Sequence, residues 1–244
     1  MANWSDPRMT AGAAPARAGV SDAAFDAGLR SYMLSVYNYM ASGVLLTGVV
    51  AMLFANSTAG QNILINGGAL RLIIMLAPLA FVLVMSFGIN RLSTVQLQAC
   101  FWGFATAMGL SMASIFLVYT GTSIATAFFA SAAAFAGLSL YGYTTQRNLS
   151  GIGTFLIMGV VGLIVAMLLN LWLQSTAMQL AISAIGVLLF AGLTAYDTQR
   201  IKSMYAYVAC TDMVGKTVVM GALSLYLDFV NMFQFLLSFM GNRR

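Results

Sequence analysis

Residues 217–241, TVVMGALSLYLDFVNMFQFLLSFMG, form an apolar run that a single aspartate, Asp228, interrupts. A membrane-spanning helix needs roughly 20 mostly apolar residues, so this run is long enough to cross a bilayer. Asp228 lies about ten residues into the run, which is roughly 15 Å along a helix that rises 1.5 Å per residue. An ionisable side chain at that depth is costly and is by default a functional candidate. The stretch therefore predicts both a membrane fold and the place of its site.

The rest of the chain repeats the apolar pattern. Only 7% of its 244 residues are charged and 61% are apolar, whereas a soluble domain has roughly 25% charged residues. Residues 1–29 are rich in Ala and Gly, lack an apolar core and are expected to be a disordered cytoplasmic tail. The sequence thus predicts an all-α integral membrane protein, a seven-transmembrane-helix bundle within residues 30–241. Its helices are expected at about 31–55, 71–90, 96–119, 124–143, 153–173, 177–197 and 218–240.

The basic residues stand singly at the ends of apolar runs. This distribution is typical of topology signals and argues against a phosphate-binding patch, so no nucleic-acid partner is expected. With the N-terminus in the cytoplasm, Arg71 is the basic residue left near an outer loop. An odd number of spans places the C-terminal Arg243 and Arg244 outside, so a re-entrant last segment is kept as an alternative. The inner loops then hold Arg91, Arg147, Arg200, Lys202 and Lys216.

The chain has no histidine, and all its acidic residues are aspartates. This excludes Ser/His and Cys/His catalysis and every His-based metal site. Cys100 and Cys210 have no CxxC partner and are interpreted as small apolar residues without a disulfide. Tyr196-Asp197 matches one half of the intramembrane aspartyl protease signature, but the GxGD half is missing before Asp228. We therefore expect no enzymatic activity and no cofactor.

Asp228 belongs to a polar stripe on an otherwise apolar helix. At 100° per residue, a polar stripe of this kind points inward, towards a cavity or a partner helix. A functional carboxylate is the preferred interpretation. The alternative is a structural lock, in which Asp228 makes a hydrogen bond to a neighbouring Ser or Tyr. The residues that share the face are Gly221, Ser224, Asp228, Asn231 and Ser238.

Asp197 is expected to end the sixth helix on the cytoplasmic side. Arg200 follows three residues later, so a plain helix-end ion pair is one interpretation. The topology favours another, because it brings Asp197, Asp228 and Arg91 to the cytoplasmic half of the bundle. Two carboxylates within hydrogen-bond reach share one proton and titrate as a coupled pair. Such a pair is a pH-sensitive latch, and Arg91 is expected to compete for Asp197.

Four segments resemble one known family. They are residues 86–91 (SFGINR), 108–111 (MGLS), 195–202 (AYDTQRIK) and 222–231 (ALSLYLDFVN). Together they resemble the Bax inhibitor-1 family, the transmembrane Bax-inhibitor-motif proteins, and in particular its bacterial, YccA-like branch. The resemblance covers about residues 28–240, and the last segment is specific because an acid inside such an apolar motif rarely arises by chance.

The resemblance implies a seven-helix fold whose last helix is wrapped by the other six. It also implies a pH-sensitive calcium leak with a paired-aspartate sensor on the last two helices. Asp197 and Asp228 match those two positions, and Arg91 matches an arginine that pairs with the first aspartate. This chain departs from shorter relatives in an expected longer loop, residues 203–216, between the last two helices.

Two functions are therefore compared. The first is a cation (calcium) leak channel in a bacterial inner membrane, gated by Asp197, Asp228 and Arg91. Ser224 and Asn231 form the supporting polar face, and the two carboxylates transiently bind the permeating calcium through oxygen ligands. The second, implied by bacterial members of the family, is a multi-pass interaction protein that modulates a membrane-bound AAA protease. Such a protease could grip the tail 1–29.

Overall fold

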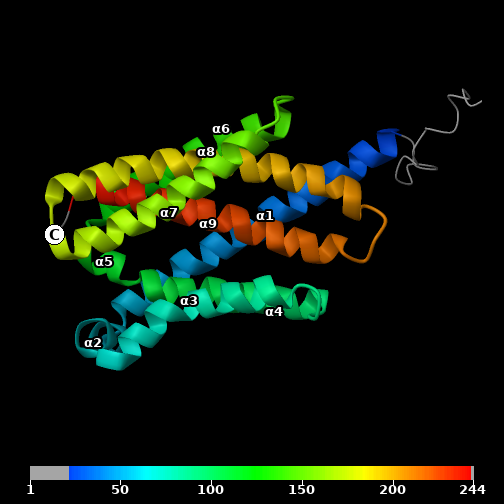
Figure 1. Ribbon diagram of the computed structural model, residues 1–244. Helices are drawn as coiled ribbons and strands as arrows, with labels where there is room; N and C mark the ends of the chain where they lie inside the picture. Colours follow the sequence, from blue (N-terminus) through cyan, green and yellow to red (C-terminus); the bar gives the residue numbers. More distant parts are fainter. Residues whose placement is uncertain (1–21, 243–244) are drawn as a thin grey trace, which may run out of the picture.

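The computed structural model describes residues 22–242 (Figure 1), which fold into antiparallel helices. Seven stretches of this part are long and apolar enough to cross a membrane, with α4 and α5 together forming one of them. The prediction of an all-α, seven-span membrane protein is confirmed. The helices are α1 (Asp22–Asn56), α2 (Thr58–Asn66), α3 (Gly68–Gly88), α4 (Thr94–Met112), α5 (Ser114–Val118), α6 (Gly121–Thr144), α7 (Ser150–Leu173), α8 (Thr176–Val208) and α9 (Val214–Met240).

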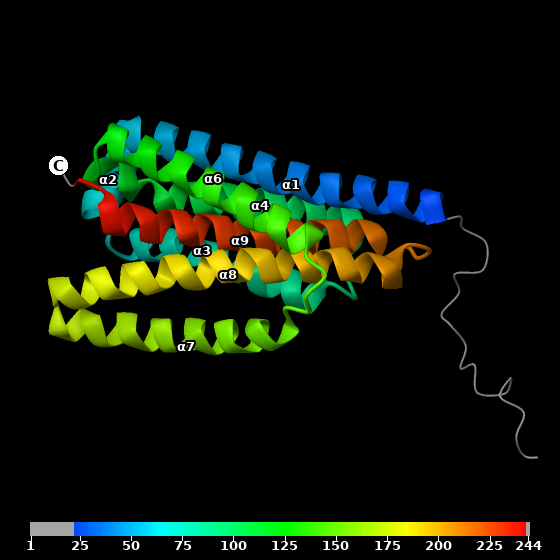
Figure 2. The same cartoon turned by 90° about the horizontal axis from the view of Figure 1, so that it is seen from above.

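The last helix, α9, lies at the centre of the bundle. In an 18-residue apolar stretch of α9, 67% of the residues are buried. In the corresponding stretches of the other spans, the buried share is 11–33%. It packs directly on α1, α4, α6 and α8, while α3 and α7 make their main contacts with α4 and α8 (Figure 2). The central last helix is therefore confirmed, with four of the other six spans forming its immediate wall.

Close helix approaches depend on residues without bulky side chains. A Cβ atom on Gly142 of α6 would meet the backbone of Ala195 in α8, and one on Gly186 of α8 would meet the ring of Phe235 in α9. Small residues at such crossings let backbones approach and gain van der Waals contact, which is the main attraction between helices in lipid. These contacts hold α8 between α6 and α9.

α1 and α8 are both longer than expected. Residues 22–29, which the sequence had assigned to the tail, belong to α1, while residues 1–21 lie outside the described part. α8 continues to Val208, so Asp197 does not end a helix, and the expected long loop 203–216 is only a turn at 209–213. The two extensions pack against each other. The ring of Tyr205 in α8 lies 5.1 Å from the ring of Phe25 and 5.2 Å from the ring of Tyr32 in α1, measured between ring centroids.

A short helix, α2, also replaces the polar loop that was expected after the first span. Its N-terminus is capped by Ser57, whose Oγ accepts a hydrogen bond from the Gly60 amide at 2.9 Å. Capping by Ser satisfies an amide that would otherwise lack a partner. The polar residues there were correctly interpreted as the end of a span, but not as the start of a helix.

α9 crosses the bundle without a break, and its far end is tied to the start of α6. The Thr120 amide donates a hydrogen bond to the Asn242 carbonyl at 3.2 Å. The described chain thus ends opposite the start of α1 (Figure 1). The last segment is therefore a continuous spanning helix and not a re-entrant one.

The start of α1 and the connections at 89–93, 145–149 and 209–213 gather at one end of the bundle. There, Lys216 Nζ donates to the Ile89 carbonyl at 3.1 Å, and Lys202 Nζ donates to the Tyr143 carbonyl at 2.7 Å. We name this end the basic end, after the residues at or near it: Arg30, Arg91, Arg147, Arg200, Lys202 and Lys216.

We expect the basic end to face the cytoplasm, because cytoplasmic loops retain Lys and Arg. In a background without Cys100 and Cys210, a cysteine at Gln174 should react with an impermeant maleimide in intact cells. A cysteine at Arg147 should react only after the cells are opened. Labelling of the Arg147→Cys variant in intact cells would reverse the orientation.

Candidate functional site

The polar stripe of α9 faces α8. Near the basic end, Gly221 lies against Ile201. Near the other end, Ser238 Oγ accepts hydrogen bonds from Gln179 Nε2 at 3.2 Å and from Ser183 Oγ at 3.1 Å. The stripe predicted from helical periodicity is therefore an interhelical surface. We call it the polar seam and define it by Asp197, Ser224, Asp228, Asn231 and Ser238.

The antiparallel register of α8 and α9 sets the heights of the two aspartates. Counted from the contacts above, Asp197 is level with Ser224, and Asp228 is level with Thr194. The two carboxylates are thus about one helical turn, ~5.4 Å, apart in height. They are close enough for the charge of Asp197 to act on Asp228. The structure brings together the two aspartates that the sequence singled out.

Asp228 is buried without a hydrogen bond. Its side chain is 4% exposed, and Oδ2 is enclosed with no partner. A structural lock requires a hydrogen bond from a neighbouring Ser or Tyr, but Tyr226 bonds Thr47 instead, at 2.7 Å. Buried polar atoms without partners are rare in native proteins and call for an explanation. The hydrogen bond that a structural lock would need is not formed at Oδ2 in this conformation.

Asp197 is half-buried, and its nearest cationic influence comes from its own helix. Arg200, one turn further along α8, is exposed and acts on Asp197 through its charge. Arg91 is exposed in the turn after α3, where its amide donates to the Gly88 carbonyl at 2.9 Å. Among the described residues 22–242, neither arginine forms an ion pair with Asp197, so the expected pairing of Arg91 with Asp197 stays a prediction.

The supporting residues Ser224 and Asn231 are half-buried on the seam. Asn231 Nδ2 donates to the Leu227 carbonyl of its own helix at 2.8 Å. With Gln179 and Gln234, Asn231 also lines a cavity of about 400 Å³ between α7, α8 and α9. Asn231 therefore connects this cavity to the level of Asp228, one turn away.

Sequence reasoning missed the polar residues that extend the seam away from the basic end. Asn170 Nδ2 donates to Gln179 Oε1 at 3.1 Å, and Gln179 and Ser183 both bond Ser238. The four-residue spacing of Gln179 and Ser183 within an apolar run was a usable signal, because it places both side chains on one helix face.

Sequence reasoning also missed a hydroxyl chain that joins three helices. Tyr37 Oη of α1 lies 2.7 Å from Ser139 Oγ of α6, which lies 3.0 Å from Thr198 Oγ1 of α8. Thr198 directly follows Asp197. No spacing within the sequence indicates this chain, because its members lie far apart and meet only after the helices pack.

The site offers few ligands for a metal ion. Within residues 22–242, no group of three or more acidic or cysteine side chains gathers. Calcium takes six to eight oxygen ligands, so the two carboxylates could supply only part of its shell. The remaining oxygens would have to come from hydroxyls, carbonyls and water.

Seven spans around a central last helix, with neighbouring carboxylates on the last two, define a class of polytopic membrane protein. Residues 29–244 match the family described as inhibitor of apoptosis-promoting Bax1. The chain is 48% identical over 221 residues to an uncharacterized protein of Rickettsia prowazekii, covering 90% of this chain and 93% of that one. It is 44% identical over 220 residues to the inner membrane protein YbhL of Escherichia coli, covering 89% and 94%.

A third relative, an uncharacterized protein of Caulobacter vibrioides, is 43% identical over 234 residues, which cover 92% of this chain and 93% of the relative. These matches extend over nearly the whole described bundle. The chain therefore belongs to the Bax inhibitor-1 family, as the sequence resemblance indicated.

Removing the Asp228 carboxylate should not destabilise the fold. Because Oδ2 has no partner, Asp228→Leu should keep or raise the melting temperature in detergent, and Asp228→Asn should change the unfolding free energy by less than about 1 kcal/mol. As a matched control on the same helix, Tyr226→Phe breaks a buried hydrogen bond and should cost about 1 kcal/mol. Greater destabilisation by Asp228→Leu than by Tyr226→Phe would make Asp228 a structural anchor.

Proposed function

We propose that this protein is a pH-sensitive calcium leak channel gated by Asp197 and Asp228. The observation that carries the proposal is the buried Asp228 carboxyl, which has no hydrogen-bond partner and lies beside a second carboxyl on the adjacent helix. Such an arrangement supplies oxygen ligands for a cation but no lasting structural bond. Membership in the Bax inhibitor-1 family supports the same function.

Two cavities that each include polar side chains support a path along the seam. One, of about 400 Å³, approaches Asp228 through Asn231 from the end opposite the basic end. The other, of about 390 Å³, lies at the basic end, where Gln199 and Arg200 of α8 face the start of α7. Along α8 and α9, the level of Asp228 lies between the two cavities, while Asp197 lies at the level of the second one. Since Asp228 is enclosed by protein, this conformation is closed at the carboxylate pair.

Protonation of the pair would control opening. One shared proton permits a charge-assisted hydrogen bond that draws α8 and α9 together. Loss of that proton introduces repulsion across the seam and creates a site that attracts a cation. Conduction in this proposal requires at least one ionised carboxylate, and Arg200 and Arg91 act as alternative counterions for Asp197.

The proposed location is a bacterial inner membrane. The Escherichia coli relative carries the name inner membrane protein, and the basic residues favour an orientation with the basic end in the cytoplasm. An open pathway in that membrane would let calcium cross without an energy source, down its gradient.

The proposal predicts pH-dependent calcium entry into proteoliposomes. Wild type should conduct as pH rises from acid to mildly alkaline values, since the pair then loses protons. Asp197→Asn and Asp228→Asn should each change the pH profile, because each leaves one carboxyl instead of a coupled pair. The double variant should lose both the pH dependence and most of the flux. A calcium-sensitive dye inside the liposomes measures all four.

Asp212→Asn is the matched control, because Asp212 is an exposed carboxylate in the turn between α8 and α9. It should conduct like wild type. Identical pH profiles for every variant would mean that the pair does not gate. If wild-type liposomes are no leakier than protein-free ones, the chain does not conduct, and modulation of a membrane-bound AAA protease through residues 1–29 takes the place of this proposal.

A further inference from the structure

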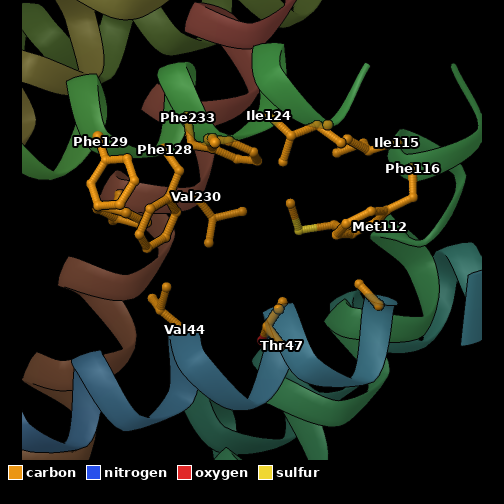
Figure 3. Close-up of a pocket in the computed structure, with 15 residues that line it drawn as sticks. Val44, Thr47, Met112, Ile115, Phe116, Ile124, Phe128, Phe129, Val230 and Phe233 are labelled. Atoms are coloured by element: carbon orange, nitrogen blue, oxygen red, sulfur yellow. The ribbon is translucent and has the colours of Figure 1, made fainter. Parts of the chain in front are cut away.

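α1 and α6 both pack on α9 but leave space between each other. The part of this space away from the basic end is an apolar crevice of about 310 Å³. Figure 3 shows Val44 and Thr47 of α1 on one side, and Phe128 of α6 and Val230 of α9 on the other. The Thr47 hydroxyl is occupied by bonds to the Ala105 carbonyl and Tyr226. This crevice suits hydrocarbon.

A second and larger crevice, of about 590 Å³, lies between α1 and α6 near the basic end. We call it the inner crevice. Its walls include Met33 of α1 and Phe135, Ala136 and Tyr143 of α6, and its mouth includes Arg30. An apolar slot open to one side of a transmembrane bundle faces lipid. Its contents are therefore expected to be hydrocarbon, with a polar group only at the Arg30 level.

Arg30 lies at the mouth of the inner crevice, and Lys202 lies next to Tyr143, which lines it. Arg30 is exposed there, and Lys202 Nζ lies 4.8 Å from the centre of the Tyr143 ring. The facing acidic residue is Asp26, exposed one turn before Arg30 on α1. Two cations against one carboxylate leave a positive balance beside an apolar slot. That combination complements a phospholipid whose headgroup is anionic.

We propose that the inner crevice binds one anionic phospholipid, with its phosphate at Arg30 and an acyl chain between α1 and α6. Lipid is the occupant that fits both halves of the site, because a free anion would leave the apolar slot unfilled. The site is separate from the polar seam, which lies on the α8 side of α9.

The back of the inner crevice leads to the seam. Tyr37 and Ser139 line the crevice and bond each other, and Ser139 bonds Thr198 beside Asp197. A lipid chain that presses on Tyr37 would therefore shift the hydroxyl chain that positions α8. This regulatory consequence rests on the proposed leak function, whereas lipid binding does not.

Native mass spectrometry of the purified full chain, titrated with phosphatidylglycerol or phosphatidylcholine, tests the site. Phosphatidylglycerol should bind wild type more tightly than phosphatidylcholine. Arg30→Gln should weaken phosphatidylglycerol binding about fivefold, the effect of one cation beside an anionic headgroup, while Arg30→Lys retains it. Ala136→Trp fills the slot and should weaken both lipids. If that variant does not fold, Ala136→Leu is the smaller replacement.

Matched controls lie close by. Arg147→Gln removes an exposed cation at the same end, and Ala133→Trp adds the same bulk one turn away on α6, at an exposed position. Both should bind like wild type. The proposal fails if Arg30→Gln and Ala136→Trp bind phosphatidylglycerol normally, or if Arg147→Gln weakens it as much as Arg30→Gln. Displacement by inorganic phosphate, with no effect of Ala136→Trp, would indicate a free-anion site and also overturn it.

Calcium flux in liposomes with and without phosphatidylglycerol separates the two proposals. Thr198→Val should uncouple flux from the lipid while leaving lipid binding intact, because Thr198 belongs to the hydroxyl chain but does not line the crevice. If lipid binds but does not change flux, only the regulatory consequence falls. If the aspartate variants all conduct like wild type while Arg30→Gln loses lipid, the leak mechanism falls and the lipid site stands.

Discussion

The burial of a carboxyl-bearing helix at the centre of a membrane bundle is the constraint on which the rest of this structure depends. α9 carries Asp228 in a stretch that would otherwise suit lipid, and an exposed carboxyl in hydrocarbon is costly. Because α1, α4, α6 and α8 surround α9, the Asp228 carboxyl is shielded from the lipid hydrocarbon. In this arrangement the polar stripe of α9 faces α8, the helix that carries Asp197.

α8 connects the parts of the molecule that bear on function. It packs along α9 at the seam, on α6 through Gly142, and on α7, which reaches the rest of the bundle mainly through it. Its C-terminal part is held by Tyr205 between two rings of α1. In the proposed mechanism, a change in the spacing of Asp197 and Asp228 would move α8 and, with it, α7, which packs on α8.

The two proposed sites lie on different sides of α9. The side towards α8 is polar and holds the carboxylate pair, whereas the side towards the gap between α1 and α6 is apolar and suits acyl chains. The hydroxyl chain from Tyr37 through Ser139 to Thr198 is a direct physical link between them. In the proposed mechanism, lipid in the inner crevice would act on the Asp197 region through only three hydrogen-bonded side chains.

Composition and apolar run length were sufficient to predict the class and the seven spans, because these depend on local hydrophobicity. Helical periodicity grouped the polar residues of α9 on one side, but Ser224, Asn231 and Ser238 on that side are only half-buried. The ends of α1 and α8 were missed, since packing of Tyr205 against Phe25 and Tyr32 extends both helices past the apolar runs. Tertiary structure alone decided that Asp228 Oδ2 lacks a hydrogen-bond partner and that a lateral crevice opens beside Arg30. These features arise from side chains distant in sequence, whose meeting depends on the register and spacing of packed helices.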